Sequence, residues 1–339
     1  MFSPHTAAIA LTARDWFRWH GPWNNAAHDA IPDSLADRRC APCRHAGARA
    51  TAREDRRRLP GRSRRPELSA RLCTFALHGL DDQASRATVL AARARHRLAL
   101  GETDQALRDT DAALAANPAS ARALVLRGMV LQVLGRADDA LAAFAEASHL
   151  NPFDADAASH SGALRLARGD AAGARADLDA ALDADASHAE ALALAGLVDM
   201  HDGDFSAAAR RFEEVARQSP VRLPYAAVWL ALSSGRADGD IPKTLAPYAW
   251  WWDDGGWPRP VVRTLMGELA PEALERQLQD NNALSSAQRA QGYFVLAQQA
   301  IAGGRHEKGL DWLRTAARIG GHLSPEAAIA RAELARLGY

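Results

Sequence analysis

The chain has 339 residues, of which 48% are hydrophobic and 24% charged, with 41 basic and 41 acidic side chains. This length and composition predict a soluble globular protein of one large or two smaller domains. No window of about 20 apolar residues occurs, so we expect no transmembrane helix. The odd number of cysteines, three, argues against a disulfide framework.

Residues 1–65 form the first segment, and they show no repeat. Residues 38–71 hold twelve arginines against only three acidic residues. This composition predicts a mostly disordered, arginine-rich extension with one helix near residues 6–19. A wrongly assigned start codon is an alternative explanation for such an extension. The short apolar run at the start has no basic flank before it, so we do not expect a secretory signal.

Residues 66–222 are predicted to form a capping helix followed by four repeats, each made of a helix A and a helix B. Leu68, Leu72 and Phe75 lie at helical spacing, which predicts that the capping helix covers the first repeat. From residue 87 onwards, four stretches align at a spacing of 34 residues, which is the length of a helix–turn–helix repeat. The recurring positions are Ala94, Gly128, Gly162 and Gly196; Gly101, Gly135, Gly169 and Gly203; Ala106, Ala140, Ala174 and Ala208; and Pro118, Pro152, Ala186 and Pro220.

Each recurring residue has a physical role in a pair of packed helices. The second glycine of the unit follows an apolar run, where a residue in the left-handed region ends helix A, and acidic residues then open helix B. Gly162 and its equivalents are expected at the crossing of the two helices, where a larger side chain would force them apart. Because Ala94 fills the equivalent place, we expect alanine to be tolerated there. Ala186 stands where the other repeats have proline, so this junction is expected to depend on Asp185 and Ser187.

Residues 223–286 are predicted to be an irregular helical segment rich in proline and tryptophan. The register of the repeats is lost at Gly235, and two short helices are expected at residues 259–268 and 271–280. Four tryptophans lie in this segment: Trp250, Trp251, Trp252 and Trp257. They either fill the interruption of the repeat or form an aromatic binding surface, and the neighbouring prolines and glycines favour the packing role.

Residues 287–339 are predicted to form a fifth repeat and a final helix. The register returns at Ala297, Gly304 and Gly309. The last helix is expected to begin after Ser324 and to end near Gly338. Since a solenoid exposes an apolar face at its end, we expect this helix to act as a cap.

The repeat register, which covers roughly residues 87–220, resembles the tetratricopeptide repeat (TPR) family. The resemblance implies an all-α fold in which helix–turn–helix units form a superhelical solenoid. Here the solenoid would carry an irregular Trp/Pro-rich helical insertion and a C-terminal capping helix. It also implies a concave groove, lined by the A helices, that binds a peptide or helix of a partner protein.

Residues 87–339 add a narrower resemblance. The strings that carry it are PYAAVWLAL, GWPRPVVRTLMGELAPEALERQL and GYFVLAQQAIAGGRHEKGLDWLRTAARIG, which are similar to the C-terminal half of NlpI-type bacterial tetratricopeptide lipoproteins. This resemblance implies a cell-envelope adaptor for proteases or peptidoglycan hydrolases, and a homodimer. The lipid-anchored members carry an apolar signal that ends in a cysteine, but no such run precedes Cys40 or Cys43. Two localisations are therefore compatible with the sequence. The lack of a signal peptide indicates the cytoplasm, whereas a misassigned start codon would be compatible with a protein in the periplasm or at the outer membrane.

No pattern in the sequence indicates catalysis. Hydrolase motifs, phosphate-binding loops and EF-hand loops are absent, and the twelve histidines are scattered singly. We therefore expect no catalytic residue, no cofactor and no metal, and a protein that is not an enzyme.

The N-terminal segment offers an alternative function, as a metal- or nucleic-acid-binding appendage on the repeats. Cys40 and Cys43 are spaced like half of a redox or zinc site, but no strand pattern precedes them, and zinc would also need Cys73 and His78. The arginine tract can attract phosphates by its charge, but no nucleic-acid-binding fold accompanies it. We favour accidental spacing of the cysteines and a solvated tail, and we do not expect nucleic acid as a partner.

The candidate partner-binding residues follow from the TPR resemblance, because the A helices line the groove. Family members that bind chaperone tails clamp a terminal carboxylate with lysine and asparagine, whereas Ala91 and Arg95 stand at the corresponding places here. The groove is mildly apolar with two arginines on one flank, which suits an amphipathic segment better than an acidic tail. The expected site consists of Arg95, Leu98, Arg122, Val125, Met129, Gln132, Val133, Ser159, Leu166, Leu197, Met200 and His201. We therefore expect a non-enzymatic protein–protein interaction scaffold or adaptor.

Overall fold

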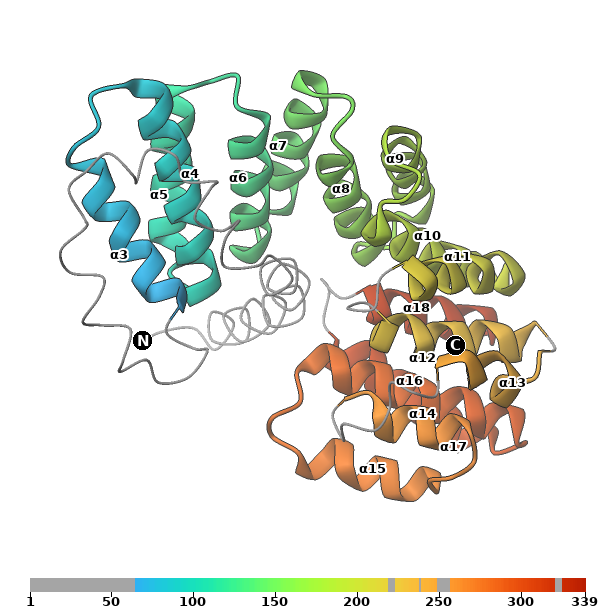
Figure 1. Ribbon diagram of the computed structural model, residues 1–339. Helices are drawn as coiled ribbons and strands as arrows, with labels where there is room; N and C mark the ends of the chain where they lie inside the picture. The colour runs from blue at the N-terminus through green and yellow to red at the C-terminus, as the bar shows by residue number, and fades with distance from the viewer. Residues whose placement is uncertain (1–64, 219–222, 238, 249–256, 321–324) are drawn as a thin grey trace. The chain divides into compact units, whose positions relative to one another are not determined.

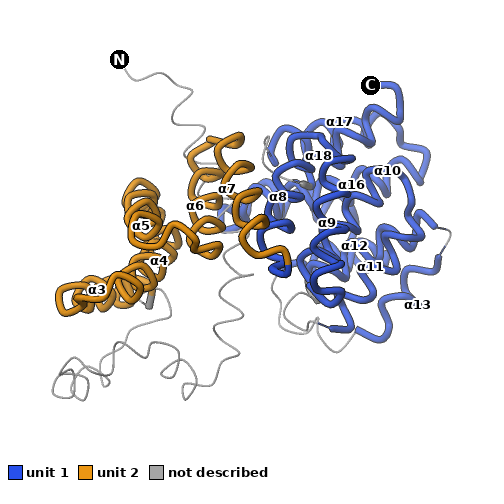
Figure 2. Tube along the Cα trace, turned by 90° about the horizontal axis from the view of Figure 1, so that it is seen from above, with its two compact units in different colours: residues 1–19, 153–339 blue, residues 20–152 orange. Residues whose placement is uncertain are grey.

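The computed structural model describes residues 65–218, 223–237, 239–248, 257–320 and 325–339. These residues form sixteen α-helices, α3 to α18, and no strand. The chain divides into two compact units (Figure 2); among the described residues, 65–152 form the N-terminal unit and 153–339 form the C-terminal unit. Residues 1–64, with most of the predicted arginine-rich extension, lie outside the described residues.

The N-terminal unit contains two helix pairs and one further helix (Figure 1). The helices are α3 Arg65–Leu77, α4 Gln83–Leu100, α5 Thr103–Ala116, α6 Ala121–Val133 and α7 Ala137–Leu150. Helix α3 packs on α4, α4 pairs with α5, and α6 pairs with α7. The A helices α4 and α6 also contact each other, as they do in a solenoid.

The C-terminal unit continues this order of helix pairs (Figure 1). The helices are α8 Ala155–Ala167, α9 Ala171–Ala184, α10 Ala189–Asp202, α11 Phe205–Gln218, α12 Leu223–Arg236, α13 Ile241–Leu245, α14 Arg259–Leu265, α15 Pro271–Asp280, α16 Ser286–Ala302, α17 His306–Ile319 and α18 Pro325–Arg336. The pairs are α8 with α9, α10 with α11, and α16 with α17, while α12 packs on α11. The predicted all-α solenoid of helix–turn–helix units is confirmed.

Glycines end the A helices as the sequence predicts. Gly101, Gly135, Gly169 and Gly203 have φ angles of 78°, 75°, 87° and 87°, which lie in the left-handed region that glycine adopts without strain. After α4, the N–H groups of Gly101 and Glu102 donate to the carbonyls of Leu98 and Arg97. This pattern satisfies carbonyls that have no partner inside the helix.

The junction without proline is held by Asp185 and Ser187, as expected. Asp185 is extended, with φ −147° and ψ 96°. Its Oδ1 accepts hydrogen bonds from the backbone N–H of Ser187 at 2.9 Å and from the Ser187 hydroxyl at 2.7 Å. These bonds fix the turn that proline fixes in the other repeats.

Glycines lie at three crossings of helix A with helix B, as predicted. A Cβ added at Gly162 would lie 2.7 Å from Leu178, one at Gly196 would lie 2.8 Å from Phe212, and one at Gly128 would lie closer still to Phe144. The expected tolerance of alanine was wrong, because these gaps are too short for a carbon–carbon contact. Ala94 is accommodated in the first repeat because the smaller Thr110 stands at the place of those three large side chains.

A charged pair links helix A to helix B at one place of the repeat. The pairs are Arg97–Asp109 at 2.8 Å in the first repeat, Arg165–Asp177 at 2.9 Å in the third and Asp199–Arg211 at 2.7 Å in the fourth. The fourth pair has the two charges exchanged between the helices. The second repeat has Leu131 and Ala143 at these places, and both of these apolar side chains are buried.

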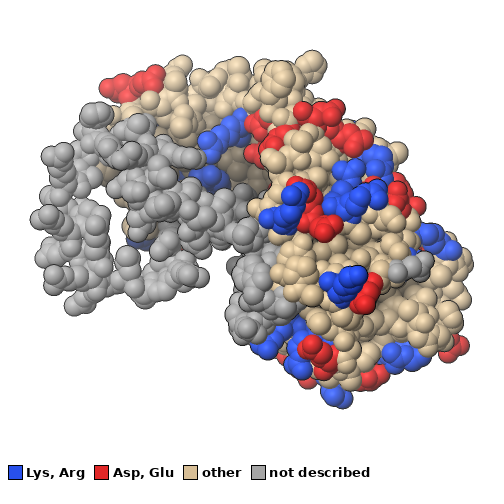
Figure 3. Space-filling view, turned by 45° about the vertical axis from the view of Figure 1, so that its right-hand side comes forward, with Lys and Arg blue, Asp and Glu red and all other residues tan. Residues whose placement is uncertain are grey.

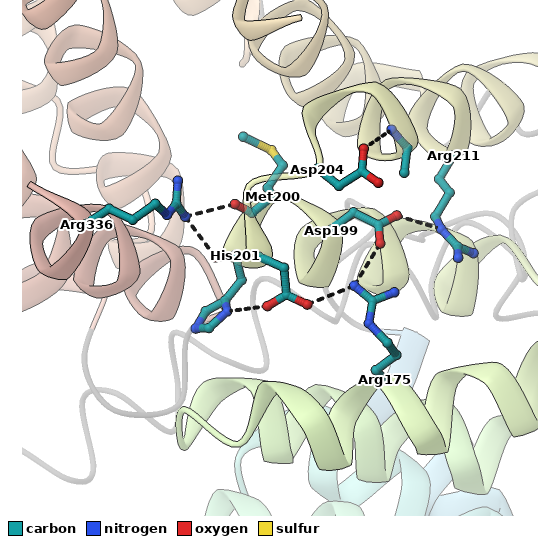
Figure 4. Close-up of polar contacts among 9 residues, drawn as sticks. Arg175, Asp199, Met200, His201, Asp204, Arg211 and Arg336 are labelled. Carbon is teal, nitrogen blue, oxygen red and sulfur yellow. Dashed lines mark hydrogen bonds and ion pairs between the residues drawn. The ribbon is translucent and has the colours of Figure 1, made fainter.

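Two of these aspartates are almost completely buried, and each of them binds two arginines. Asp109 is 3% exposed and also binds Arg93 at 2.7 Å. Asp199 is 2% exposed and lies between Arg175 and Arg211 (Figure 4), with Arg175 at 2.9 Å. Paired guanidinium groups offset the cost of removing each carboxylate from water.

Helix α3 differs from its prediction. It packs on α4, but Leu68, Leu72 and Phe75 are 51%, 55% and 66% exposed, so the apolar stripe expected to cover the first repeat faces away from it. Leu77 packs instead against the cluster around Leu90, and the Thr74 hydroxyl accepts a hydrogen bond from Arg93 at 3.2 Å. The i, i+4, i+7 spacing identified one face of a helix correctly but not which face is buried.

The described parts of the segment 223–286 contain the helices α12 to α15, and one tryptophan of this segment lies in the core. Trp229 of α12 is completely buried, with its ring centroid 6.2 Å from that of Phe212 and 5.6 Å from that of Phe294. Trp257 is partly buried against the same core and donates from Nε1 to Gln291 at 3.2 Å. The two short helices expected here correspond to α14 and α15, whereas Trp250, Trp251 and Trp252 lie outside the described residues.

Candidate partner-binding site

In the N-terminal unit, the candidate residues lie on α4 and α6. Arg95 and Leu98 belong to α4, and Arg122, Val125, Met129, Gln132 and Val133 belong to α6. The apolar members are buried, Arg95 is half-buried and Arg122 is exposed. The Oε1 atom of Gln132 is buried and accepts no hydrogen bond from the described residues.

Arg95 and Arg122 bring two positive charges together. Burial lowers the pKa of Arg95, and the nearby charge of Arg122 lowers it further, while Cys73 acts in the opposite direction. Arg122 is the second residue of α6, so its charge also lies at the positive end of the helix dipole. Within the described parts of the chain, no carboxylate forms an ion pair with either arginine. This corner therefore holds positive charge that an anionic group would stabilise.

In the C-terminal unit, the candidate residues lie beside the last helix of the chain. Ser159 and Leu166 belong to α8, and Leu197, Met200 and His201 belong to α10. Helix α18 packs along both α8 and α10, and also on α16 and α17. Of these five side chains, only that of His201 is more than slightly exposed. The sequence predicted α18 as a cap, but gave no sign that it returns to the earlier repeats.

Polar contacts hold α18 in this place. Arg331 donates to the carbonyl of Ala167 at 3.0 Å, and Arg336 donates to the carbonyls of Met200 and His201 at 3.0 and 2.8 Å (Figure 4). Glu333 forms an ion pair with Arg236 of α12 at 2.6 Å. Tyr225, also of α12, donates to Glu326 at 3.2 Å.

Other candidate chemistry finds no site in the described part of the chain. Cys40 and Cys43 lie outside it, and Cys73 is a partly buried thiol on α3. Among the residues described, no three histidine, cysteine or acidic side chains are placed to hold a metal ion. His188 contacts Asp156 of the preceding repeat at 3.1 Å.

The described surface does not gather charge of one sign on the face seen in Figure 3, where basic and acidic side chains lie interspersed. None of the helices described is long and apolar enough to cross a membrane.

Comparisons with known proteins agree with the repeat register. The model of the family described as Tetratricopeptide repeat matches residues 91–155 and 127–189. No curated protein sequence matches the chain.

Among solved structures, a chain of the APC/C hetero-tetramer Cut9–Hcn1 is similar, with 15% identity and a TM-score of 0.52 over 81% of this chain and 46% of that one. This chain thus aligns with less than half of its length. A tetratricopeptide repeat protein from Parabacteroides merdae is 14% identical, with a TM-score of 0.45 over 78% and 92% of the two chains. The TPR protein TTC0263 from Thermus thermophilus is 21% identical, with a TM-score of 0.42 over 48% and 89%. The repeated segment therefore matches the tetratricopeptide repeat, and the described chain has the fold of a tetratricopeptide-repeat solenoid.

Proposed function

We propose that this protein is a non-enzymatic interaction scaffold that binds a peptide or helix of a partner protein on the A helices of its N-terminal unit. The fold supports an interaction scaffold in general, because stacked repeats form extended binding surfaces. We place the binding site on these helices because no described carboxylate neutralises Arg95 and Arg122.

The same pair indicates the chemistry of the partner. Guanidinium groups bind carboxylates through charge-assisted, often bidentate hydrogen bonds, and complementary charges favour the correct partner over others. Val125 and Met129 follow Arg122 along α6 but are 8% and 7% exposed, so the two arginines are the accessible part of this site. The proposed ligand is therefore a peptide or helix with an acidic residue that meets the arginines.

Charge reversal tests this proposal. Tagged wild-type protein is compared with the double variant Arg95→Glu/Arg122→Glu by affinity purification, photo-crosslinking and quantitative mass spectrometry. Arg71→Glu/Arg108→Glu is the control, since both of its arginines are exposed on other helices of the same unit. We expect crosslinked partners to be lost in the first variant and kept in the second. Equal partner sets in all three proteins would contradict this site.

A finer proposal is that the partner is a protease or a peptidoglycan hydrolase of the cell envelope, and that the protein acts as a homodimer. Its support is the resemblance of residues 87–339 to NlpI-type lipoproteins. Identification of the crosslinked partners tests the first part, and light scattering after size exclusion tests the second. Partners confined to cytoplasmic proteins would contradict the cell-envelope role. A monomer at every concentration would contradict the homodimer.

A further inference from the structure

Helix α18 occupies the face that a solenoid usually offers to its partners. We call the surface formed by α8, α10, α12 and α16 the A-helix face of the C-terminal unit. Helix α18 contacts all four of these helices, and it also packs on the preceding helix α17. Its central residues are at most 4% exposed: Glu326, Ala327, Ala328, Ile329, Ala330 and Glu333.

The two arginines of α18 recognise a repeated feature of this face. Ala167 and His201 stand 34 residues apart, at the same place of successive repeats, and both lie in the last turn of an A helix. Carbonyls at such ends have no partner within their helix. Arg331 supplies a donor to the first and Arg336 to the second, each placing positive charge at the negative end of a helix dipole.

The spacing of the arginines fits the spacing of the repeats. Five residues of α-helix span about 7.5 Å, and packed helices lie roughly 8–10 Å apart. A helix with arginines at positions i and i+5 can therefore bind the ends of two neighbouring A helices at once. A glutamate at i+2, as in Glu333, adds the ion pair with Arg236.

Little of the contact depends on large apolar side chains. Three of the six buried residues of α18 are alanines and two are glutamates, and only Ile329 and Leu334 are larger aliphatic residues packed on the core. Small side chains let the helix lie close to the face, while the polar groups determine its position. Another helix with the same polar pattern could make the same contacts.

We propose that the A-helix face of the C-terminal unit is a helix-binding site that α18 fills in the resting protein. Its external ligand is an alanine-rich helix with two arginines five residues apart and a glutamate between them, which exchanges with α18. Because α18 is tethered to the site, it acts at high effective concentration and keeps the site closed to weak ligands. This site shares no residue with the site at Arg95 and Arg122, so a negative result at one site does not contradict the proposal for the other.

A labelled peptide of residues 325–339 tests this proposal on the full chain. Its affinity is measured by fluorescence anisotropy for the wild type, for Arg331→Ala/Arg336→Ala and for the control Arg210→Ala/Arg276→Ala, whose arginines are exposed on α11 and α15. We expect the first variant to bind the peptide roughly tenfold or more tightly than the other two proteins, because its own α18 competes less well. A peptide that carries the two alanines should not bind.

Hydrogen exchange separates an exchangeable ligand from a part of the core. In Arg331→Ala/Arg336→Ala with bound peptide, the amides of the chain's own α18 should lose protection while those of α8 to α17 keep theirs. Absence of tighter peptide binding in this variant would overturn the proposal. Loss of protection throughout α8 to α17 would overturn it as well, since α18 would then be an integral part of the fold.

Discussion

At the scale of single residues, the packing of helix A on helix B depends on complementary sizes at one place of each repeat. Gly128→Ala should destabilise the protein by about 1–3 kcal/mol, because the new Cβ would collide with the ring of Phe144. Chemical denaturation measures this change. In a chain that also carries Phe144→Thr, which reproduces the Ala94 and Thr110 pair, the cost of Gly128→Ala should fall. Strictly additive effects of the two substitutions would show that the residues do not compete for this space.

The neighbouring aspartates of α5 offer a second contrast at this scale. Asp109 is buried between Arg93 and Arg97, whereas Asp111 is 53% exposed and pairs with Arg127 alone among the described residues. Asp109→Ala should cost about 3–5 kcal/mol, because two poorly hydrated guanidinium groups lose their partner. Asp111→Ala should cost about 1 kcal/mol or less, as is usual for a surface ion pair. Denaturation midpoints that change equally for the two variants would contradict this account.

At the scale of the element, the start of α9 makes stability depend on pH. Asp170 accepts a hydrogen bond from the N–H of Gly173 at 2.9 Å and one from Arg165 at 3.0 Å, and these bonds lower the pKa of its carboxyl group. A carboxyl whose pKa is lower in the folded state stabilises the fold above its unfolded pKa, and this contribution is lost as the pH falls through the folded value. Asp170→Ala should therefore lower Tm at neutral pH, by a capping energy of about 0.5–2 kcal/mol.

Melting curves at a series of pH values check this prediction. The difference in Tm between wild type and Asp170→Ala should shrink below roughly pH 4, where this carboxyl group begins to take up a proton in the unfolded chain. Asp138, an exposed residue in the first turn of α7, gives a control variant, Asp138→Ala. A difference in Tm that persists unchanged in acid would mean that the charge of Asp170 is not what stabilises the helix.

Elements that repeat were predicted well from the sequence, because their signals are local. Gly101 ends α4 through its own backbone geometry, and Gly162 marks a crossing because its neighbour Leu178 belongs to the same repeat. The buried face of α3 was not predicted, since Leu72 and the opposite face are both compatible with a helix. The shape of α4 decides which face of α3 is buried, and the sequence of α3 alone does not contain that information.

The place of α18 escaped prediction for a related reason. Ala167 and Met200 bind the arginines of α18 through their backbone carbonyls, which are the same in every residue. Only the arginines at positions 331 and 336 carried a signal. This signal is weak, because all but two of the basic residues in this chain are arginines. The expected groove stays a prediction, and the sequence could not show that α18 covers the candidate residues of α8 and α10.

At the scale of the whole molecule, the two units are expected to respond separately to damage. The core of the C-terminal unit draws on residues from α8 to α18, with Trp229 completely buried at its centre. Trp229→Ala should cost about 3–5 kcal/mol, and stability in a solenoid passes mainly between neighbouring repeats. Hydrogen exchange resolved by segment should show lost protection in α10 to α18 and nearly unchanged protection in α4 and α5. Uniform loss along the chain would mean that the units unfold as one.

The hydrogen bond from Arg331 to Ala167 joins residues that are 164 positions apart. During synthesis, α8 and α10 leave the ribosome long before the last helix exists. Their terminal carbonyls must then be satisfied by water, and the C-terminal unit can be completed only after α18 has been translated. Chains that terminate before α18 would therefore keep the preceding helix pairs and expose the face that α18 covers, and exposed surface of this kind makes incomplete chains prone to aggregation.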